Sequence, residues 1–431
     1  MGGKWRTAAL GELCDFRAGS VFKPALQGRS SGQFPFVKVS DMNLPANAVR
    51  IQDANNWVSE DDLRELRAKP FPPGTVVFAK IGEALRQNRL RQVARETVVD
   101  NNMMGAVPRV DRVDPRYFYY ALSLFDFSEI AQGTALPYLT VASLSALTLD
   151  IPPADEQRAI AHILGTLDDK IEVNRRMSET LEEIARAIFK SWFVDFDPVR
   201  AKMEGRDPGL APEIAALFPD RLVETENSEL PEGWPQVTFD ELARPVTDVV
   251  RAEELSSDEP YIGLEHMPRR SITLAEWGST EELASHKVRF RQGDILFGKL
   301  RPYFHKVGYA LIDGVCSTDI VVLRPTHEHF GALLLFTASS DAFVAFNDMA
   351  STGTRMPRTS WGRMREYAIA LPKAEVADAF QRLVEPMLDR IRVSVFQSRT
   401  LAALRDLLLP KLMSGEIRVK DAEKLLGQAG A

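Results

Sequence analysis

Two long stretches of the chain carry apolar residues at alternating spacings of three and four positions. Between residues 155 and 194 the repeat consists of Ile160, Leu164, Leu167, Ile171, Leu181 and Ile188. Between residues 374 and 416 it consists of Phe380, Val384, Met387, Ile391, Leu401 and Leu408. This spacing places the apolar residues along one side of a helix and is typical of coiled coils. It predicts two long helices that most simply pair with each other; the alternative is that each packs separately, as an amphipathic helix, on its own domain.

Prolines and small polar residues modify this helical pattern. Pro152-Pro153 and Pro372 immediately precede the two stretches, and proline opposes helical dihedrals in the residue before it. We call the line of heptad positions along each helix its seam. Near the middle of each seam the apolar residues give way to polar ones, Asn174 with Ser178 and Ser394 with Ser398. Pro386 lies inside the second stretch, so we expect it to kink that helix or to delay its regular start.

The chain repeats itself at an offset of 219 to 220 residues. FPPGTVVFAKIG at 71–82 matches FRQGDILFGKLR at 290–301, and GTALPYLT at 133–140 matches GTRMPRTS at 353–360. In each copy, short apolar runs separated by Gly and Pro precede the long helix, which indicates strands and turns. The pattern predicts an α+β fold: two tandem, similar domains of mixed sheet plus helices, each followed by a long helix, with the two helices paired as an antiparallel coiled coil.

The same pattern suggests where the parts begin and end. We expect a first domain at 1–154, a first helix at 155–194, a linker rich in proline and acidic residues at 195–229, a second domain at 230–373, a second helix at 374–416 and a short tail at 417–431.

Composition narrows the class of protein. The 431 residues are 45% hydrophobic and 26% charged, as in globular proteins. No apolar run approaches the roughly 18 residues that would span a bilayer, and the first residues lack the pattern of a signal peptide. Cys14 and Cys316 stand far apart, which excludes a disulfide framework. We expect a cytoplasmic protein.

Several segments resemble catalytic or metal-binding motifs but lack a residue or a setting that the motif requires. The segment from Gly293 to Lys299 has the outline of a phosphate loop, but Leu300 follows where Ser or Thr would bind Mg²⁺, and the intervening residues indicate a strand. His327 and His329 have no third ligand nearby in sequence. Asp168-Asp169-Lys170 resembles part of a nuclease site, but we expect it on the solvent side of the heptad. Methyltransferase and dinucleotide motifs are absent from the sequence, so we predict no catalytic residues and no metal site.

Basic and aromatic residues recur at matching points of the two copies. The first set is Lys80, Arg86, Arg89, Arg91, Thr134 and Tyr138; the second is Lys299, Arg301, Tyr303, Thr354, Arg355, Arg358 and Trp361. Such side chains contact phosphates and base edges in DNA complexes. A single exposed Arg is usually only hydrated, but recurrence in both copies predicts DNA contact for the sets. The net charge of −7 is compatible with this prediction if the acidity lies on the helices and the linker.

The helices also predict a geometry. A helix of about 38 residues is about 57 Å long, a little less than two turns of B-DNA. Two similar but non-identical domains held apart by such helices should recognise an asymmetric, two-part sequence with a fixed gap.

Three further blocks resemble one protein family. They are LDIPPADEQRAIAHILGTLDDKI at 149–171, FKSWFVDFDPVRAKMEGR at 189–206 and LRDLLLPKLMSGEIRV at 404–419. With the duplicated plan, they make nearly the whole chain similar to the specificity (S) subunit of type I restriction–modification systems. Pro386, inside the second helix, is a departure from the family's pattern.

The resemblance carries its own expectations. It implies a non-catalytic chain with two target-recognition domains, which binds double-stranded DNA and no membrane. Its coiled coil would set the gap and dock two modification (methyltransferase) subunits, which restriction (translocase and nuclease) subunits then join. No cofactor is expected in this chain, whereas S-adenosylmethionine, ATP and Mg²⁺ are expected in the partner subunits. Two alternatives remain open: a coiled-coil scaffold without a role on DNA, and a self-contained modification enzyme.

Overall fold

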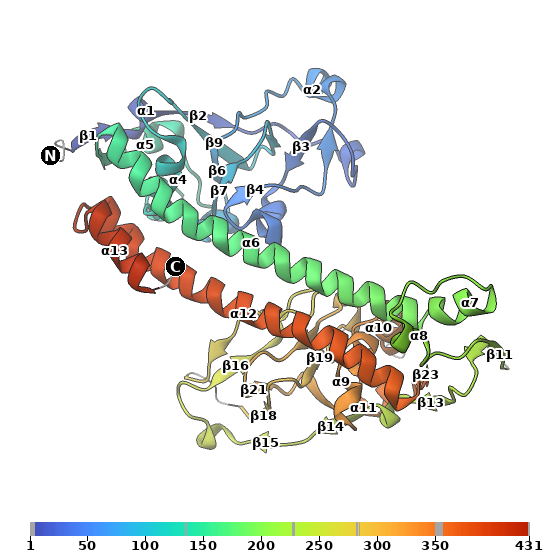
Figure 1. The fold of residues 1–431 in the computed structure, drawn as a ribbon. Helices are drawn as coiled ribbons and strands as arrows, with labels where there is room; N and C mark the ends of the chain where they lie inside the picture. The colour runs from blue at the N-terminus through green and yellow to red at the C-terminus, as the bar shows by residue number, and fades with distance from the viewer. Residues whose placement is uncertain are drawn as a thin grey trace. The chain divides into compact units, whose positions relative to one another are not determined.

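The computed structural model describes residues 5–133, 136–225, 229–281, 283, 285–349 and 357–429. The chain forms two compact units, and both long helices contribute to each of them (Figure 1). Unit 1 comprises Met1–Glu172 with Arg399–Ala431, and unit 2 comprises Val173–Ser398. Each unit therefore contains one strand-rich domain and part of each long helix.

The two long helices are equal in length. Helix α6 covers Ala154–Phe193 and α12 covers Ala374–Met413, so each has 40 residues. The predicted delay of the second helix at Pro386 is wrong, because α12 begins twelve residues before this proline. Val376, Ala377 and Phe380 are buried in the core of unit 2, and this packing holds the first turns helical. Pro386 itself is exposed.

The helices pair in antiparallel fashion within each unit. In unit 1, Asp168 of α6 binds Arg405, which lies near the end of α12. In unit 2, the ring of Trp192 near the end of α6 lies 5.9 Å from that of Phe380, near the start of α12. The Asn174 amide also donates to the Ser398 hydroxyl over 3.3 Å in unit 2. These contacts confirm the paired helices and exclude separate packing.

The seam residues lie in or against the two main cores. Nearly complete burial is found for Ile160, Leu164, Leu167, Phe380, Val384, Ile391, Leu401 and Leu408. Half-buried positions against the same cores are Ile171, Leu181, Ile188 and Met387. Asn174, Ser178 and Ser394 are buried too, so the middle of the seam is a polar layer.

One acidic residue of α6 is not where the heptad suggested. Asp168 was expected on the solvent side, but only 5% of it is exposed. Its carboxylate accepts hydrogen bonds from the Tyr120 hydroxyl (2.5 Å) and the Arg405 guanidinium (2.7 Å). The heptad describes only the helix-to-helix contact, and the first domain covers this flank of α6 as well.

The domain of unit 1 is built on two small sheets. The first has the strand order β2 (Cys14–Ala18), β9 (Met103–Pro108), β6 (Val76–Ala79), β7 (Leu90–Val93) and β4 (Arg50–Ile51). The second has the order β5 (Trp57–Val58), β3 (Phe34–Val37) and β8 (Val98–Val99). A separate pair joins β1 (Arg6–Ala9) to β10 (Thr148–Ile151). The helices are α1 (Leu10–Leu13), α2 (Glu60–Leu66), α3 (Glu83–Arg86), α4 (Pro115–Ser123) and α5 (Val141–Ser145).

The domain of unit 2 repeats this plan. Its first sheet has the order β14 (Ala243–Val246), β22 (Ile320–Pro325), β19 (Ile295–Gly298) and β20 (Val307–Tyr309). Its second has the order β15 (Val249–Val250), β18 (Lys287–Phe290), β21 (Gly314–Ser317), β16 (Pro260–Ile262) and β17 (Gly278–Ser279). A pair joins β13 (Gln236–Thr238) to β23 (Ala368–Ala370). The helices are α9 (Gly331–Ala338), α10 (Asp341–Met349) and α11 (Trp361–Met364).

The strand pairings confirm the duplication. Antiparallel β6 and β9 correspond to antiparallel β19 and β22, and parallel β3 and β8 correspond to parallel β16 and β21. Between the copies lie α7 (Asp197–Met203), α8 (Pro212–Ala215), β11 (Leu222–Glu224) and β12 (Glu229–Pro231), and the tail forms α13 (Val419–Ala429). The α+β fold of two tandem, similar domains with paired long helices is therefore as predicted.

Candidate nucleic-acid interface

In the first domain, one end of the main sheet gathers residues from three segments. Lys80 follows β6; its backbone N–H donates to Asn102 O (2.9 Å), and its carbonyl accepts from Leu139 N–H (2.9 Å). Next along the chain, Gly82 N–H donates to Pro137 O (2.8 Å), and Tyr138 forms a β-bridge with Ile81. Lys80 and Tyr138, distant in sequence, thus lie at the same end of the sheet.

The second domain holds its residues by the same backbone hydrogen bonds. Lys299 N–H donates to Asp319 O (2.8 Å), and Lys299 O accepts from Thr359 N–H (3.0 Å). Arg301 N–H donates to Pro357 O (2.8 Å), and Arg358 bridges to Leu300. We call these matching surfaces the first edge (Lys80, Asn102 and Tyr138) and the second edge (Lys299, Asp319 and Arg358).

The two edges present different chemistry on this common backbone. Tyr138 is 43% exposed and stands where the second edge has a cation. In the second edge the Arg358 guanidinium donates to the Asp319 carboxylate over 2.5 Å. Burial, and secondly the charge of Arg358, lower the pKa of Lys299. Both edges contain a lysine; the first edge adds an amide and a phenol, whereas the second adds an ion pair.

The other predicted basic residues of the first domain follow Lys80 on the β6–β7 connection. Arg86 pairs with Glu83 at 3.3 Å in α3, and Arg89 donates to the Asn43 side chain. Arg91 lies on β7, where its guanidinium donates to Met42 O (3.1 Å) and Leu90 O (2.7 Å), and burial lowers its pKa. Arg86 and Arg89 remain exposed beside these partners, whereas Arg91 is half-buried.

The matching β19–β20 connection carries the predicted residues of the second domain. The Arg301 guanidinium lies 5.7 Å from the Phe304 ring centre, and half of Tyr303 is exposed. Arg269, which the sequence pattern did not single out, stacks on the same ring at 4.0 Å. Trp361 is half-buried, with its ring 6.2 Å from that of Phe239. DNA contact by each of these residues stays a prediction.

Two residues of the edges, Asn102 and Asp319, were not predicted from the sequence. Thr134, Thr354 and Arg355 lie outside the described residues. Asn102 and Asp319 were missed because the strands that follow them share little sequence. A signal existed, because these strands, β9 and β22, both end at a proline, Pro108 and Pro325.

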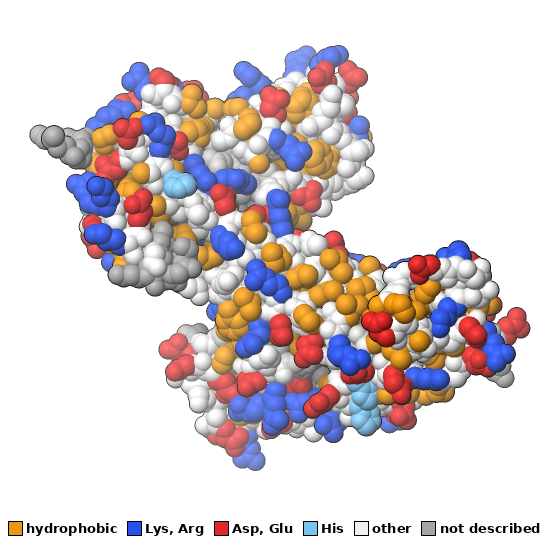
Figure 2. Space-filling view, viewed as in Figure 1, with side chains coloured by type: hydrophobic (Ala, Val, Ile, Leu, Met, Phe, Trp, Pro, Cys, Tyr) orange, Lys and Arg blue, Asp and Glu red, His pale blue; other side chains and the backbone are white. Residues whose placement is uncertain are grey.

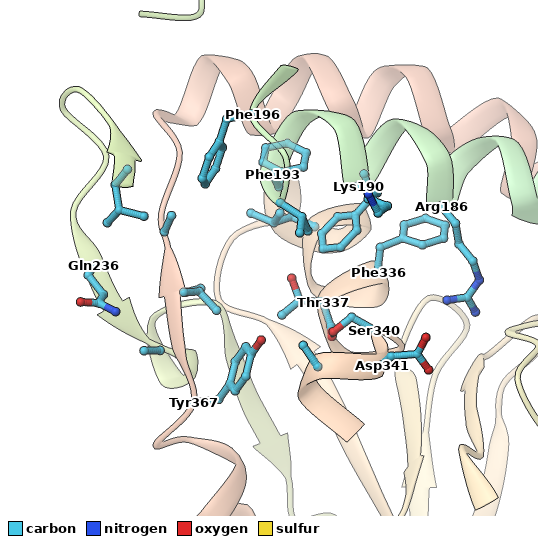
Figure 3. A pocket seen from close by; sticks show the side chains of 18 of the residues that line it. Arg186, Lys190, Phe193, Phe196, Gln236, Phe336, Thr337, Ser340, Asp341 and Tyr367 are labelled. Atoms are coloured by element: carbon cyan, nitrogen blue, oxygen red, sulfur yellow. The ribbon is translucent and has the colours of Figure 1, made fainter. Parts of the chain in front are cut away.

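A pocket of about 680 Å³ opens in unit 2 beside the end of α6 (Figure 3). Phe193, Phe336 and Tyr367 are among the side chains that line it. Its cations are engaged: Arg186 pairs with Glu182 (2.8 Å), Arg200 with Glu229 (3.2 Å) and Lys190 with Asp195. The Ser340 hydroxyl donates to Thr337 O. This lining forms an apolar groove, and it does not assemble an activated nucleophile.

The phosphate-loop-like segment and the two cysteines are part of the folded core. Gly293–Lys299 contains strand β19 instead of a phosphate loop. Burial raises the pKa of Cys14 and of Cys316 to about 12, which keeps both thiols protonated. Across the described part of the chain, no three His, Cys, Asp or Glu side chains form a group that could hold a metal ion.

None of the described helices has, by itself, the length and apolar character to cross a bilayer. Two short segments, Glu328–Ala338 and Asp341–Met349, reach that length and apolar character only when taken together, and the chain bends by 65° between them.

An apolar surface runs along the helices of unit 2. Val173 and Ile184 of α6 are 50% and 43% exposed, and they lie eleven residues apart, about three helical turns. Val393 of α12 occupies the position equivalent to Val173, and Leu383 is exposed nearby on α12. Figure 2 shows hydrophobic side chains gathered over this part of the helices. We call Val173, Ile184, Leu383 and Val393 the helix face of unit 2.

Comparisons with known proteins agree on one family. The model of the type I restriction modification DNA specificity domain matches residues 2–183. The chain is 23% identical to the type I restriction enzyme MjaIX specificity subunit of Methanocaldococcus jannaschii, over 97% of this chain and 94% of that protein. It is 26% identical to the HindI specificity subunit of Haemophilus influenzae, over 74% of this chain and 81% of that protein.

A solved structure has the same fold. The crystal structure of the type I restriction–modification system S subunit from M. genitalium aligns with a TM-score of 0.56 at 14% sequence identity. The alignment covers 95% of this chain and 96% of that chain.

Proposed function

Because this chain belongs to the family of type I restriction–modification specificity subunits, we propose that it is the subunit that selects the DNA target, with each domain recognising one half of an asymmetric, two-part sequence. One observation carries this proposal. The same backbone hydrogen bonds hold Lys80 beside Tyr138 and Lys299 beside Arg358. A common frame with different side chains is suited to recognise two different half-sites in the same manner.

The long helices are proposed to set the gap between the half-sites. Each has 40 residues and is therefore about 60 Å long. A turn of B-DNA is about 34–36 Å, so helices of this length suit two half-sites placed on separate stretches of one duplex.

The helix face of unit 2 is proposed to dock a modification subunit. Exposed Val, Ile and Leu on neighbouring helices favour burial against apolar partner surfaces. Restriction subunits would join the assembled complex. S-adenosylmethionine, ATP and Mg²⁺ would then act in the partner chains, while this chain supplies no reacting group and no cofactor site.

Methylated-base sequencing tests the proposed function. The chain is expressed with its neighbouring methyltransferase in a host free of other DNA methylation. We expect methylated adenines within one two-part motif with a fixed gap, because two domains held at a constant separation would bind two half-sites at only one spacing. Methylation that is absent, or confined to a single continuous motif, would contradict the proposal.

Two further measurements separate the alternatives. Methyl transfer by the purified chain alone would favour a self-contained modification enzyme. A scaffold without a role on DNA would show no affinity for duplex, whereas a protein that contacts phosphates binds duplex with an affinity that falls steeply as salt rises.

A further inference from the structure

The second edge contains an arginine that is held in place in the free protein. The Arg358 guanidinium donates to the Asp319 carboxylate over 2.5 Å, yet 57% of the Arg358 side chain remains exposed. Both residues are fixed through their backbones, Arg358 by its bridge to Leu300 and Asp319 by its hydrogen bond from Lys299. The Asp319 N–H also donates to the Ser317 hydroxyl at 3.2 Å.

Such a pair contributes little to stability when it is exposed. Its chemistry is better suited to recognition. A guanidinium has five N–H donors in a planar fork, so that donors remain after one nitrogen binds the carboxylate. Arginine donating two hydrogen bonds to guanine O6 and N7 is the commonest base-specific contact in the major groove. Orienting the fork in advance lowers the entropy lost when that contact forms.

The first edge has no such arginine–carboxylate pair. Its equivalent positions hold Tyr138 and Asn102, and neither side chain provides a charged fork. The difference lies on matching backbone positions, so it distinguishes the two domains without changing the frame that carries the side chains.

We infer that Asp319 orients Arg358 as a fork that recognises a guanine, and that this guanine belongs only to the half-site of the second domain. The inference rests on the proposed function, because it names a specificity-determining pair within the proposed interface. Asp319 acts here as a positioning residue through Arg358, and Arg358 makes the contact to the base.

The test compares methylated motifs produced by the chain and its variants with the neighbouring methyltransferase. Arg358→Lys keeps the positive charge but removes the fork. We expect it to relax one guanine position in one half-site, with discrimination against the other bases falling about tenfold or more. Asp319→Asn should relax the same position by a smaller factor, since it weakens only the orientation. The other half-site should stay unchanged in both variants.

Two further variants complete the design. Asp15→Asn is the matched control, because it breaks another exposed ion pair, that of Asp15 with Arg109 at 2.6 Å. This pair lies toward the other end of the main sheet of unit 1 from the first edge. The control variant should leave the motif unchanged. Tyr138→Ala should alter the half-site that Arg358→Lys does not, which assigns each half to its domain.

The outcomes separate this inference from the proposed function. If the unmodified chain gives no two-part motif, the proposed function fails. If the motif is present, the inference fails when Arg358→Lys leaves every guanine position intact or relaxes a position that is not guanine. It also fails when Arg358→Lys lowers methylation equally at all sites, since Arg358 would then contact phosphate or hold the loop.

Discussion

Asp168 shows how much one buried side chain contributes to the arrangement within unit 1. Its carboxylate binds Tyr120 of α4 and Arg405 of α12, so it links the first domain to both helices. Arg405 occupies a seam position that is Ala185 in the other copy, and Ala185 is buried in the core of unit 2. A charge at the seam of α12 is tolerated because Asp168 neutralises it.

Replacing this carboxylate should destabilise the protein measurably. Asp168→Ala leaves the Arg405 guanidinium and the Tyr120 hydroxyl without their acceptor, and breaking a buried pair costs about 3 kcal/mol or more in free energy of unfolding. Urea denaturation followed by circular dichroism measures this loss. Glu179→Ala is the control on the same helix, because Glu179 pairs with Arg175 in a more exposed i, i+4 position that contributes about 0.3–0.5 kcal/mol. Equal losses for the two variants would show that the Asp168 network is not structural.

At the scale of elements, the two flanks of α6 have opposite surroundings. Within unit 1, Asp168 lies on a flank of α6 that the first domain covers. Within unit 2, Glu182 lies on a flank that the second domain covers. Glu182 accepts from Ile272 N–H (3.0 Å) and the Ser271 hydroxyl (2.8 Å). The other flank carries exposed Val173 and Ile184 of the helix face. Within unit 2, helix α6 thus packs against the second domain on one flank and leaves an apolar surface on the other.

The sequence could predict the seam but not these flanks. Heptad spacing follows directly from helix geometry, so the paired helices were predictable. Glu182 and Glu183 are adjacent and chemically identical, yet only Glu183 is exposed. Glu182 is buried because a loop of the second domain, about 90 residues away in sequence, covers it. The spacing of residues along the helix contains no information about that loop. An acidic residue beside a seam therefore indicates neither burial nor exposure.

The helix face gives a prediction for assembly. Val173→Asp combined with Ile184→Asp should weaken binding of a modification subunit by about 100-fold or more, because the interface would have to bury unpaired carboxylates. Both side chains are already exposed in the free chain, so its thermal unfolding should change little. Co-purification and size-exclusion chromatography with the methyltransferase measure the effect. Glu183→Lys changes an exposed charge between the two flanks and should assemble normally; full assembly of the double variant would exclude this face as the docking site.

For the whole molecule, the repeat made the equivalence of the two candidate interfaces predictable. Matching blocks of the sequence align Lys80 with Lys299 and Tyr138 with Arg358. The contacts within each edge were not predictable, because Asn102 and Asp319 reach them through strand pairing. The ion pair of Arg358 with Asp319 joins residues 39 positions apart, and they meet because both pair with the segment after β19: Asp319 with Lys299 and Arg358 with Leu300.

The length of the paired helices should determine the gap in the DNA target. Seven residues inserted after Glu172 in α6 and seven after Ser398 in α12 preserve the heptad register and lengthen both helices by about 10 Å. DNA rises about 3.4 Å per base pair, so the gap in the methylated motif should grow by about three base pairs. Both half-sites should keep their sequences, since the insertions lie outside the domains. Inserting two residues in each helix is the comparison, because it turns the seam beyond the insertion by about 200° and should abolish methylation. If the seven-residue variant methylates a motif with the original gap, the helices do not set the spacing.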